Sequence, residues 1–358
     1  MMNKQPNSSI YNQFIGGFKF YELRLQNQST YNLFTIIAFI VILFSIPSTI
    51  CAETSVSGDI RQNTTWTLEG SPYIVTGDIT VASLDYSYHS DPDSVRLTIE
   101  PGVQIRFNPG TGLIVGIGFH SIAGYYGALS VQGTAESPVA FTSNAESPAP
   151  GDWKGIYFRN ETHDAATLLE HCVVEYGGHT QNANIYFANA NPVINNSTIR
   201  FSSSDGIYLS NSSPAIDNNT ITNNSNYGIS GNIYSAGFIT DNTLSDNGQA
   251  AINIHPSAAG RVSGNSGSGN GQDLIRVYGG ELRANSTWVK QELPFGITGD
   301  ITVSSWDFSD HSNPCSVTLT IEPGVQIRFN PGTGLIVGIT FHSNAGYYGA
   351  LSAQGTAD

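Results

Sequence analysis

The chain contains two copies of one long segment. Residues Asn63 to Glu136 return, without a gap, as Asn285 to Asp358. The best-preserved part, Leu97 to Leu129, differs from its second copy at two positions, where Gly118 is replaced by Thr340 and Ile122 by Asn344. Self-similarity on this scale indicates an architecture of stacked repeats.

A shorter repeat of about 22 to 23 residues lies between the two copies. Each unit carries three short apolar pieces separated by Gly, Asn, Ser or Pro, a pattern that predicts short strands joined by turns. The apolar residues recur at three offsets: Ile194, Ile216, Ile239 and Val262; Ile199, Ile221 and Leu244; and Ile207, Ile229, Ile252 and Ile275.

These repeats predict an all-β fold, a right-handed parallel β-helix with three strands in each coil of about 22 to 23 residues. Stacking equivalent coils pairs each strand with the strands above and below it, so that backbone groups bond between coils. The right hand follows because connections between parallel strands overwhelmingly take that hand. A second, incomplete copy of the same fold is expected at the C-terminus.

A polar position follows the first apolar piece of each coil. Ser197, Asn219, Asn242 and Asn265 occupy it, and Cys172 occupies it one coil earlier. Asn side chains in this position can hydrogen-bond to the copies above and below. We therefore expect an internal asparagine column, with Cys172 as a small stacking residue rather than a reactive thiol.

Several segments carry a resemblance to known proteins: GDITV (Gly77 to Val81), LTIEPGVQIRF (Leu97 to Phe107), GALSVQGT (Gly127 to Thr134), GDWKGIYF (Gly151 to Phe158) and the coils from Leu168 to Tyr278. From about residue 60 onward, the chain resembles secreted right-handed parallel β-helix proteins, the pectin-lyase-like superfold with carbohydrate-binding and sugar-hydrolysis repeats. The resemblance implies the fold and an association with polysaccharides or cell surfaces. It implies no particular reaction.

The N-terminus predicts export from the cell. The apolar run Leu33 to Ile46 follows three basic residues, and it is shorter than the roughly 20 apolar residues that span a membrane. Because Ala52 offers a cleavage point, residues 1–52 are predicted to be a signal peptide, with an uncleaved anchor as the alternative. The mature chain is then expected to be secreted or on the cell surface, without a membrane span.

The repeats also predict the domain organisation. A first β-helix is expected over residues 53–280, with its N-terminal end capped by residues 53–76, and a second, truncated β-helix starts over residues 281–358. The second copy stops at Asp358, where the first continues into further coils. We therefore expect a fragment, a premature stop or a partner that covers the last coil.

The charge balance narrows the choice of partners. The chain carries a net charge of -14, which disfavours nucleic acid because a phosphate backbone requires a basic surface. Extracellular glycan or a cell-surface protein is the expected partner.

The three cysteines imply no disulfide framework. No cofactor is required by any motif, and calcium is possible.

Two groups of residues are candidate binding sites. Asp85, Asp91 and Asp93 lie close together in one polar segment and could hold calcium through oxygen ligands, or could instead belong to a solvated loop. Aromatic rings in a second segment could contact sugar rings, or could instead pack against the solenoid. These predicted ligand-binding residues are Phe119, His120, Tyr125 and Tyr126, with their copies Phe341, His342, Tyr347 and Tyr348.

Catalysis has weaker support in the sequence. Glu170, His171 and Asp205 are the candidates, because paired carboxylates about 5 to 9.5 Å apart can hydrolyse glycosidic bonds. The Asp-Gly pair at Asp205 resembles that of polygalacturonase-type hydrolases, but it lacks their second adjacent Asp. The sequence therefore favours a non-catalytic β-helix module that binds extracellular polysaccharide or a surface partner. The alternative is a polysaccharide lyase or glycoside hydrolase acting in a groove along the β-helix.

Overall fold

The computed structural model describes residues 11–15, 18–22, 53–84, 87–88, 94–120, 123–180, 182–305, 309–310, 316–342 and 345–355. The chain divides into two compact units, Met1–Ile50 and Cys51–Asp358. In the first unit, β1 (Tyr11–Ile15) pairs with β2 (Phe18–Glu22) in antiparallel fashion. The apolar run behind the signal-peptide prediction lies outside the described residues.

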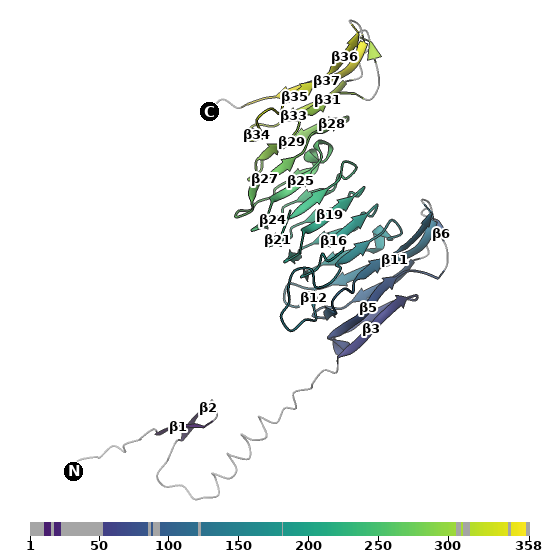
Figure 1. Ribbon diagram of the computed structural model, residues 1–358, viewed down its shortest axis with the longest axis vertical. Coiled ribbons are helices and arrows are strands. Elements are labelled where there is room, and N and C mark those ends of the chain that lie inside the picture. The colour runs from purple at the N-terminus through teal and green to yellow at the C-terminus, as the bar shows by residue number, and fades with distance from the viewer. Residues whose placement is uncertain are drawn as a thin grey trace, which may run out of the picture. The chain divides into compact units, whose positions relative to one another are not determined.

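The second unit is a stack of parallel strands in three ladders, here named A, B and C, whose rungs are visible in Figure 1. Ladder A consists of β4 (Thr64–Trp66), β7 (Ser94–Ile99), β11 (Ala123–Gln132), β14 (Leu168–Glu170), β17 (Val193–Asn195), β20 (Ala215–Asp217), β23 (Phe238–Thr240) and β26 (Val262–Ser263). Ladder B consists of the first half of β5 (Tyr73–Val81), then β8 (Gln104–Phe107), β12 (Val139–Ser143), β15 (Cys172–Glu175), β18 (Thr198–Arg200), β21 (Thr220–Thr222) and β24 (Thr243–Ser245). Ladder C consists of the second half of β5, then β9 (Leu113–Val115), β13 (Ile156–Phe158), β16 (Ala183–Ala188), β19 (Asp205–Ser210), β22 (Ile229–Gly231), β25 (Ala250–Ile254) and β27 (Gln272–Val277).

The predicted apolar positions form the core of the solenoid. Each of the three predicted sets lies on one ladder, and every member is at most 1% exposed. The spacing of 22 to 23 residues holds for the middle coils, where the backbone N–H of one residue donates to the side chain of its equivalent 22 or 23 residues later. The first coils are longer, with contacts between residues 33 apart, because they carry excursions from the solenoid. The all-β parallel fold is therefore confirmed.

Each coil turns from one ladder to the next at a residue with left-handed backbone. His171, Asn196, Asn218 and Asp241 lie between ladders A and B with φ of 47°, 50°, 55° and 54°. Tyr176, Phe201, Asn223 and Asp246 take the same conformation between ladders B and C. Asn and Asp tolerate this conformation best, which explains why they recur in the turns.

Two internal polar columns follow these turns. In the predicted column, the backbone N–H of Ser197 donates to Asn219 Oδ1 at 3.0 Å, and that of Asn219 donates to Asn242 Oδ1 at 2.9 Å. Cys172 begins this column, with its N–H donating to Ser197 Oγ at 3.0 Å. A second column, not predicted, links Ser202, Asn224, Asn247 and Asn270 in the same way at the next turn.

The first coils contain the entry strand and a flap. Strand β3 (Thr54–Ile60) pairs in parallel with β5, and Trp66 stacks on Tyr73 with ring centroids 4.8 Å apart. Strands β6 (Ser87–Tyr88) and β10 (Ile117–His120) both pair with the first residues of β11 in antiparallel fashion, which makes a flap beside ladder A (Figure 1).

The second copy continues the stack with the following strands: β28 (Gly280–Leu282), β29 (Ser286–Trp288), β30 (Phe295–Ile297), β31 (Ile301–Val303), β32 (Ser309–Asp310), β33 (Ser316–Ile321), β34 (Ile327–Phe329), β35 (Leu335–Val337), β36 (Ile339–His342) and β37 (Ala345–Ala353). Strand β30 pairs with β27 of ladder C, although its equivalent in the first copy lies on ladder B. The pairing of Gly280 with Ile301 repeats that of Gly58 with Ile79. The segment β27–β28 thus completes the last coil of the first copy. It also pairs with β30 and β31 of the second copy, as β3 pairs with β5 in the first copy.

The described helical segments are three short 3₁₀ helices: η1 (Leu68–Gly70), η2 (Asp164–Ala166) and η3 (Pro256–Arg261). In the part of the chain that the structure describes, no helix is long and apolar enough to cross a membrane.

Candidate functional site

A row of three tyrosines lies on the outer side of ladder C. Tyr157, Tyr186 and Tyr208 occupy equivalent positions on successive strands, between inward-pointing residues of the core. The ring centroids of Tyr157 and Tyr186 are 5.0 Å apart, and those of Tyr186 and Tyr208 are 5.1 Å apart. All three side chains are partly exposed. The strand spacing therefore sets the spacing of the rings, and the row runs from coil to coil along the stack.

Polar and basic groups extend the tyrosine row. The register continues from Tyr208 to Ser230, Asn253 and Arg276. Arg276 donates to Asn253 Oδ1 at 2.8 Å and to the Tyr227 hydroxyl at 3.2 Å. At the other end, the Arg159 guanidinium lies 5.2 Å from the centre of the Tyr157 ring. The acidic chain thus places an arginine at each end of this row.

The hydroxyl groups of Tyr157 and Tyr208 stay protonated. Burial raises the pKa of Tyr157, and burial together with the nearby Tyr186 and Asp205 raises the pKa of Tyr208. Burial also raises the pKa of Tyr278 to about 12, and its hydroxyl donates to the Gly231 carbonyl at 2.8 Å. At ordinary pH these tyrosines present neutral hydroxyls that donate and accept hydrogen bonds.

The predicted catalytic residues lie on different ladders. Glu170 is at the end of β14 on ladder A, and His171 follows it in the left-handed turn position that Asn196 and Asn218 occupy in later coils. Asp205 begins β19 on ladder C. The structure therefore brings Glu170 and His171 together as chain neighbours and does not bring Asp205 to them.

Asp205 holds the coil above it. Its Oδ1 accepts hydrogen bonds from Asn226 Nδ2 at 2.6 Å and from the Tyr227 N–H at 3.2 Å, while its Oδ2 accepts from the Ser230 hydroxyl. Burial raises its pKa, and these three hydrogen bonds oppose the rise. Asp205 is only 5% exposed, and the contacts of its carboxylate described here join one coil to the next.

Trp153 and Glu175, which lie near Glu170 in the sequence, are both engaged in contacts within the solenoid. Trp153 is fully buried on Phe107, with ring centroids 4.0 Å apart, and its Nε1 donates to the Glu175 carbonyl. The Glu175 carboxylate pairs with Arg200 at 2.7 Å on ladder B. Across the described residues, no group of three or more His, Cys, Asp or Glu side chains is placed to hold a metal ion.

The other predicted sites are only partly described. Asp85, Asp91 and Asp93 lie outside the described residues, so the calcium site stays a prediction. The side chains of Phe119, His120, Phe341 and His342 are likewise outside them, although their backbones belong to β10 and β36. Tyr126 is 2% exposed, whereas its copy Tyr348 is partly exposed, as are Tyr125 and Tyr347. In the first copy, therefore, Tyr125 offers more surface to a ligand than Tyr126 does.

Two family models match the chain. Residues 58–186 match the pectate-lyase-like β-helix domain, and residues 183–356 match the right-handed β-helix region. The chain is a right-handed parallel β-helix protein. Its solenoid is similar to the A-module of the mannuronan C-5 epimerase AlgE4 of Azotobacter vinelandii, at 12% identity and a TM-score of 0.27, over 85% of this chain and 89% of that chain. No curated protein sequence matches this β-helix.

Sequence reasoning missed the tyrosine row of this β-helix. Tyr186 and Tyr208 each follow an inward isoleucine of the repeat, so the period itself places them on one outer face. Tyr157 is harder to find because a longer connection separates its coil from the next one. The signal available in the sequence was a tyrosine that recurs directly after the inward isoleucine of successive coils.

Proposed function

We propose that this chain is a non-catalytic β-helix module, secreted or displayed on the cell surface, which binds extracellular polysaccharide along the tyrosine row. The row of rings about 5 Å apart is the observation that supports the proposal. Tyrosine combines a flat apolar face with a polar hydroxyl, which suits a sugar ring that has C–H groups on its face and hydroxyls at its edge. The row runs from coil to coil along the stack, which suits an extended polymer.

The surroundings of the row add polar contacts. Asn253 and Arg276 carry amide and guanidinium donors one and two coils beyond Ser230. Arg159 is partly exposed, and its guanidinium lies 5.2 Å from the centre of the Tyr157 ring. Donors of this kind can fix the position of sugar hydroxyls, while the rings supply contact area.

An enzyme that cleaves polysaccharide is the alternative. It draws on the pectate-lyase-like match of residues 58–186. The candidates Glu170 and Asp205 lie on separate ladders, and the Asp205 carboxylate is hydrogen-bonded to Asn226, Tyr227 and Ser230 of the next coil. The binding module is therefore the better supported of the two.

The test is retention of the full chain on immobilised neutral and acidic polysaccharides, with Tyr186→Ala and Tyr208→Ala as variants. Each variant is expected to weaken retention about tenfold, because central aromatic residues dominate binding surfaces. Phe238→Ala is the matched control, since Phe238 is an exposed aromatic residue on ladder A. Equal losses in all three variants, or none in the two tyrosine variants, would reject the tyrosine row.

Reducing-end release and unsaturated uronate absorbance, measured on the same polysaccharides, test the enzyme. Activity that disappears in Glu170→Gln would favour the enzyme over the binding module.

The variant Tyr125→Ala, included in the retention assay, tests whether the flap also contacts glycan.

A further inference from the structure

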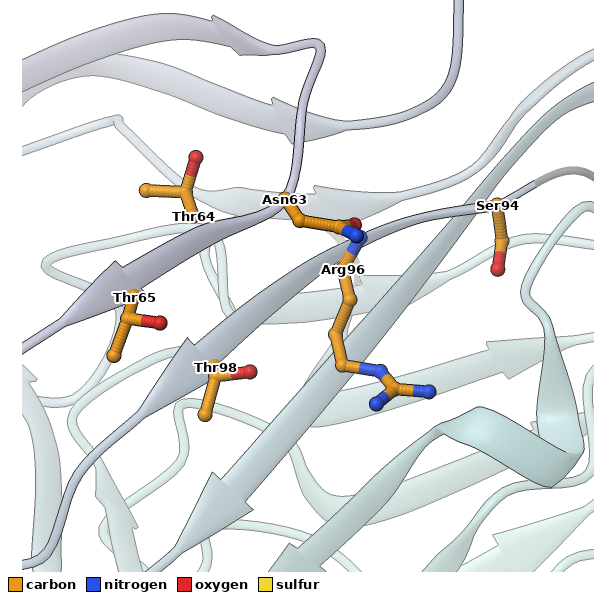
Figure 2. A pocket seen from close by; sticks show the side chains of 6 residues that line it. All are labelled: Asn63, Thr64, Thr65, Ser94, Arg96 and Thr98. Carbon is orange, nitrogen blue, oxygen red and sulfur yellow. The ribbon is translucent and has the colours of Figure 1, made fainter.

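A second polar site lies at the N-terminal end of ladder A, away from the tyrosine row of ladder C. Here a pocket of about 280 Å³ is lined by Asn63, Thr64, Thr65, Ser94, Arg96 and Thr98. Figure 2 shows the Arg96 side chain extended, with Ser94 and Thr98 on either side of it. All six residues come from β4, β7 and the residue before β4.

The lining of this pocket, here named the Arg96 pocket, is rich in donors and contains no carboxylate. Arg96 is exposed, and its guanidinium forms none of the ion pairs found among the described residues. A guanidinium has five N–H donors in a planar fork that matches an oxyanion. The hydroxyls of Thr65, Ser94 and Thr98 add donors around it.

Two hydrogen bonds shape the Arg96 pocket. Asn63 Oδ1 accepts the backbone N–H of Arg96 at 2.8 Å, which leaves the donating Nδ2 of the same amide for other partners. The Ser94 hydroxyl lies 2.8 Å from Nδ1 of His163, at the start of η2. Asn63 and His163 therefore hold two of the lining residues, Arg96 and Ser94, in position.

The second copy provides an internal comparison. There Asn285 Oδ1 accepts the N–H of Thr318 at 2.8 Å, and Thr287 pairs with Thr320 as Thr65 pairs with Thr98. Ser316 stands in place of Ser94. The Asn hydrogen bond and the threonine pair are therefore repeated, but the guanidinium is present only in the first copy, where Arg96 stands at the position that Thr318 occupies in the second copy.

We propose that the Arg96 pocket binds the oxyanion of a small acidic ligand, either the carboxylate of a uronic acid or a sulfate group. The guanidinium holds the anion through paired N–H donors, and the hydroxyls of Thr65 and Thr98 complete its contacts. This site is independent of the proposed tyrosine row, because it lies on a different ladder and uses charge rather than aromatic contact.

The experiment titrates the full chain with glucuronate, inorganic sulfate and neutral glucose, and follows the backbone amide NMR signals of Thr65 and Thr98. Glucuronate or sulfate is expected to shift these signals, less strongly at higher salt, and glucose is not. Arg96→Thr should weaken binding at least about tenfold, since it removes charged hydrogen bonds. Arg96→Lys should bind more weakly than the wild type but better than Arg96→Thr, because it keeps the charge and loses the fork.

Thr318→Arg gives the reverse test. This variant should make the amides of Thr287 and Thr320 respond to the same anions, because the Asn285 hydrogen bond and the Thr287–Thr320 pair are already in place. A response to sulfate alone assigns the pocket to sulfate, and a response to glucuronate assigns it to carboxylated sugars. A wild-type chain that binds neither anion, or an Arg96→Thr variant that binds as the wild type does, overturns the proposal.

Discussion

The carboxylate of Glu161 lies directly against Gly118, so closely that a Cβ atom on Gly118 would come within 2.6 Å of both carboxylate oxygens. Glu161 is 3% exposed and also contacts Gly116 and Gly124. The flap of β10 and β11 therefore packs on the buried Glu161 side chain through glycines, Gly118 and Gly124, which leave room for it. The second copy has Thr340 at the position of Gly118.

Gly118→Thr is expected to destabilise the first flap. A threonine there forces Glu161 out of its packed position, and overpacking of this kind typically costs about 1 to 3 kcal/mol. Thermal unfolding of the variant and of Thr340→Gly as the control measures the effect. Adding Glu161→Ala should restore much of the loss in Gly118→Thr, and equal stability of Gly118→Thr and wild type would contradict the contact.

Asn242→Ala is expected to destabilise the middle of the solenoid by roughly 3 to 5 kcal/mol, because several buried groups lose their partners together. The Asn242 amide donates to the Ile216 carbonyl and to Asn265 Oδ1, and its Oδ1 accepts from Asn219. Hydrogen exchange of the neighbouring coils measures the loss. Asn223→Asp is the control, because Asn223 is exposed in a turn that Asp tolerates. Similar exchange in the two variants would argue against the column.

Asp205 should make stability fall as pH rises. Burial raises the pKa of this carboxyl above its ordinary value of 3.8, so the folded chain keeps a proton that the unfolded chain has released. Between the two pKa values the folded state binds more protons, and stability declines with increasing pH until the folded pKa is passed. Asp205→Asn should remove this decline while keeping the contacts with Asn226 and Ser230.

Urea unfolding between about pH 4 and 7 checks this expectation. The exposed Asp246, changed to Asn, serves as the control for removal of one carboxylate. A wild-type pH dependence that Asp205→Asn leaves unchanged would assign the decline to other groups.

Cys172 should be inert in the folded chain. Burial raises the pKa of its thiol to about 12, so no thiolate is available at neutral pH. Iodoacetamide should label Cys172 only after denaturation, in a chain where Cys51 and Cys315 are changed to Ser. Cys172→Ser should cost no more than about 1 kcal/mol, because Ser197 fills the equivalent position in the next coil. Fast labelling of the native chain would instead indicate an open coil.

The inward positions could be predicted because a solenoid repeats one environment many times. Ile216 and Ile239 are buried on ladder A because each coil presents the same offset to the same core. The asparagine column through Asn219 was predictable for the same reason. The second column through Asn224 has the same period, and each of its members likewise follows a turn residue, but it was not predicted.

The outer surface was less predictable. Periodicity says which residues point outward, but not which of them have neighbours that make a site. Tyr208 belongs to a row of rings only because it pairs with Tyr186 of another coil. The Arg96 pocket likewise depends on Asn63, which lies 33 residues away in the sequence. The role of His171 as a turn residue becomes plain only when its φ of 47° is compared with that of Asn196.

The segment β27–β28 has a further consequence for how such a chain grows. Since one strand finishes a coil below and templates a coil above, a tandem duplication can lengthen the rod without inventing a new interface or a linker. The number of coils can then change in evolution independently of the side chains on the outer surface. Each added module can keep the shared scaffold and lose or gain a single outward side chain, as the exchange of arginine for threonine between the two copies illustrates.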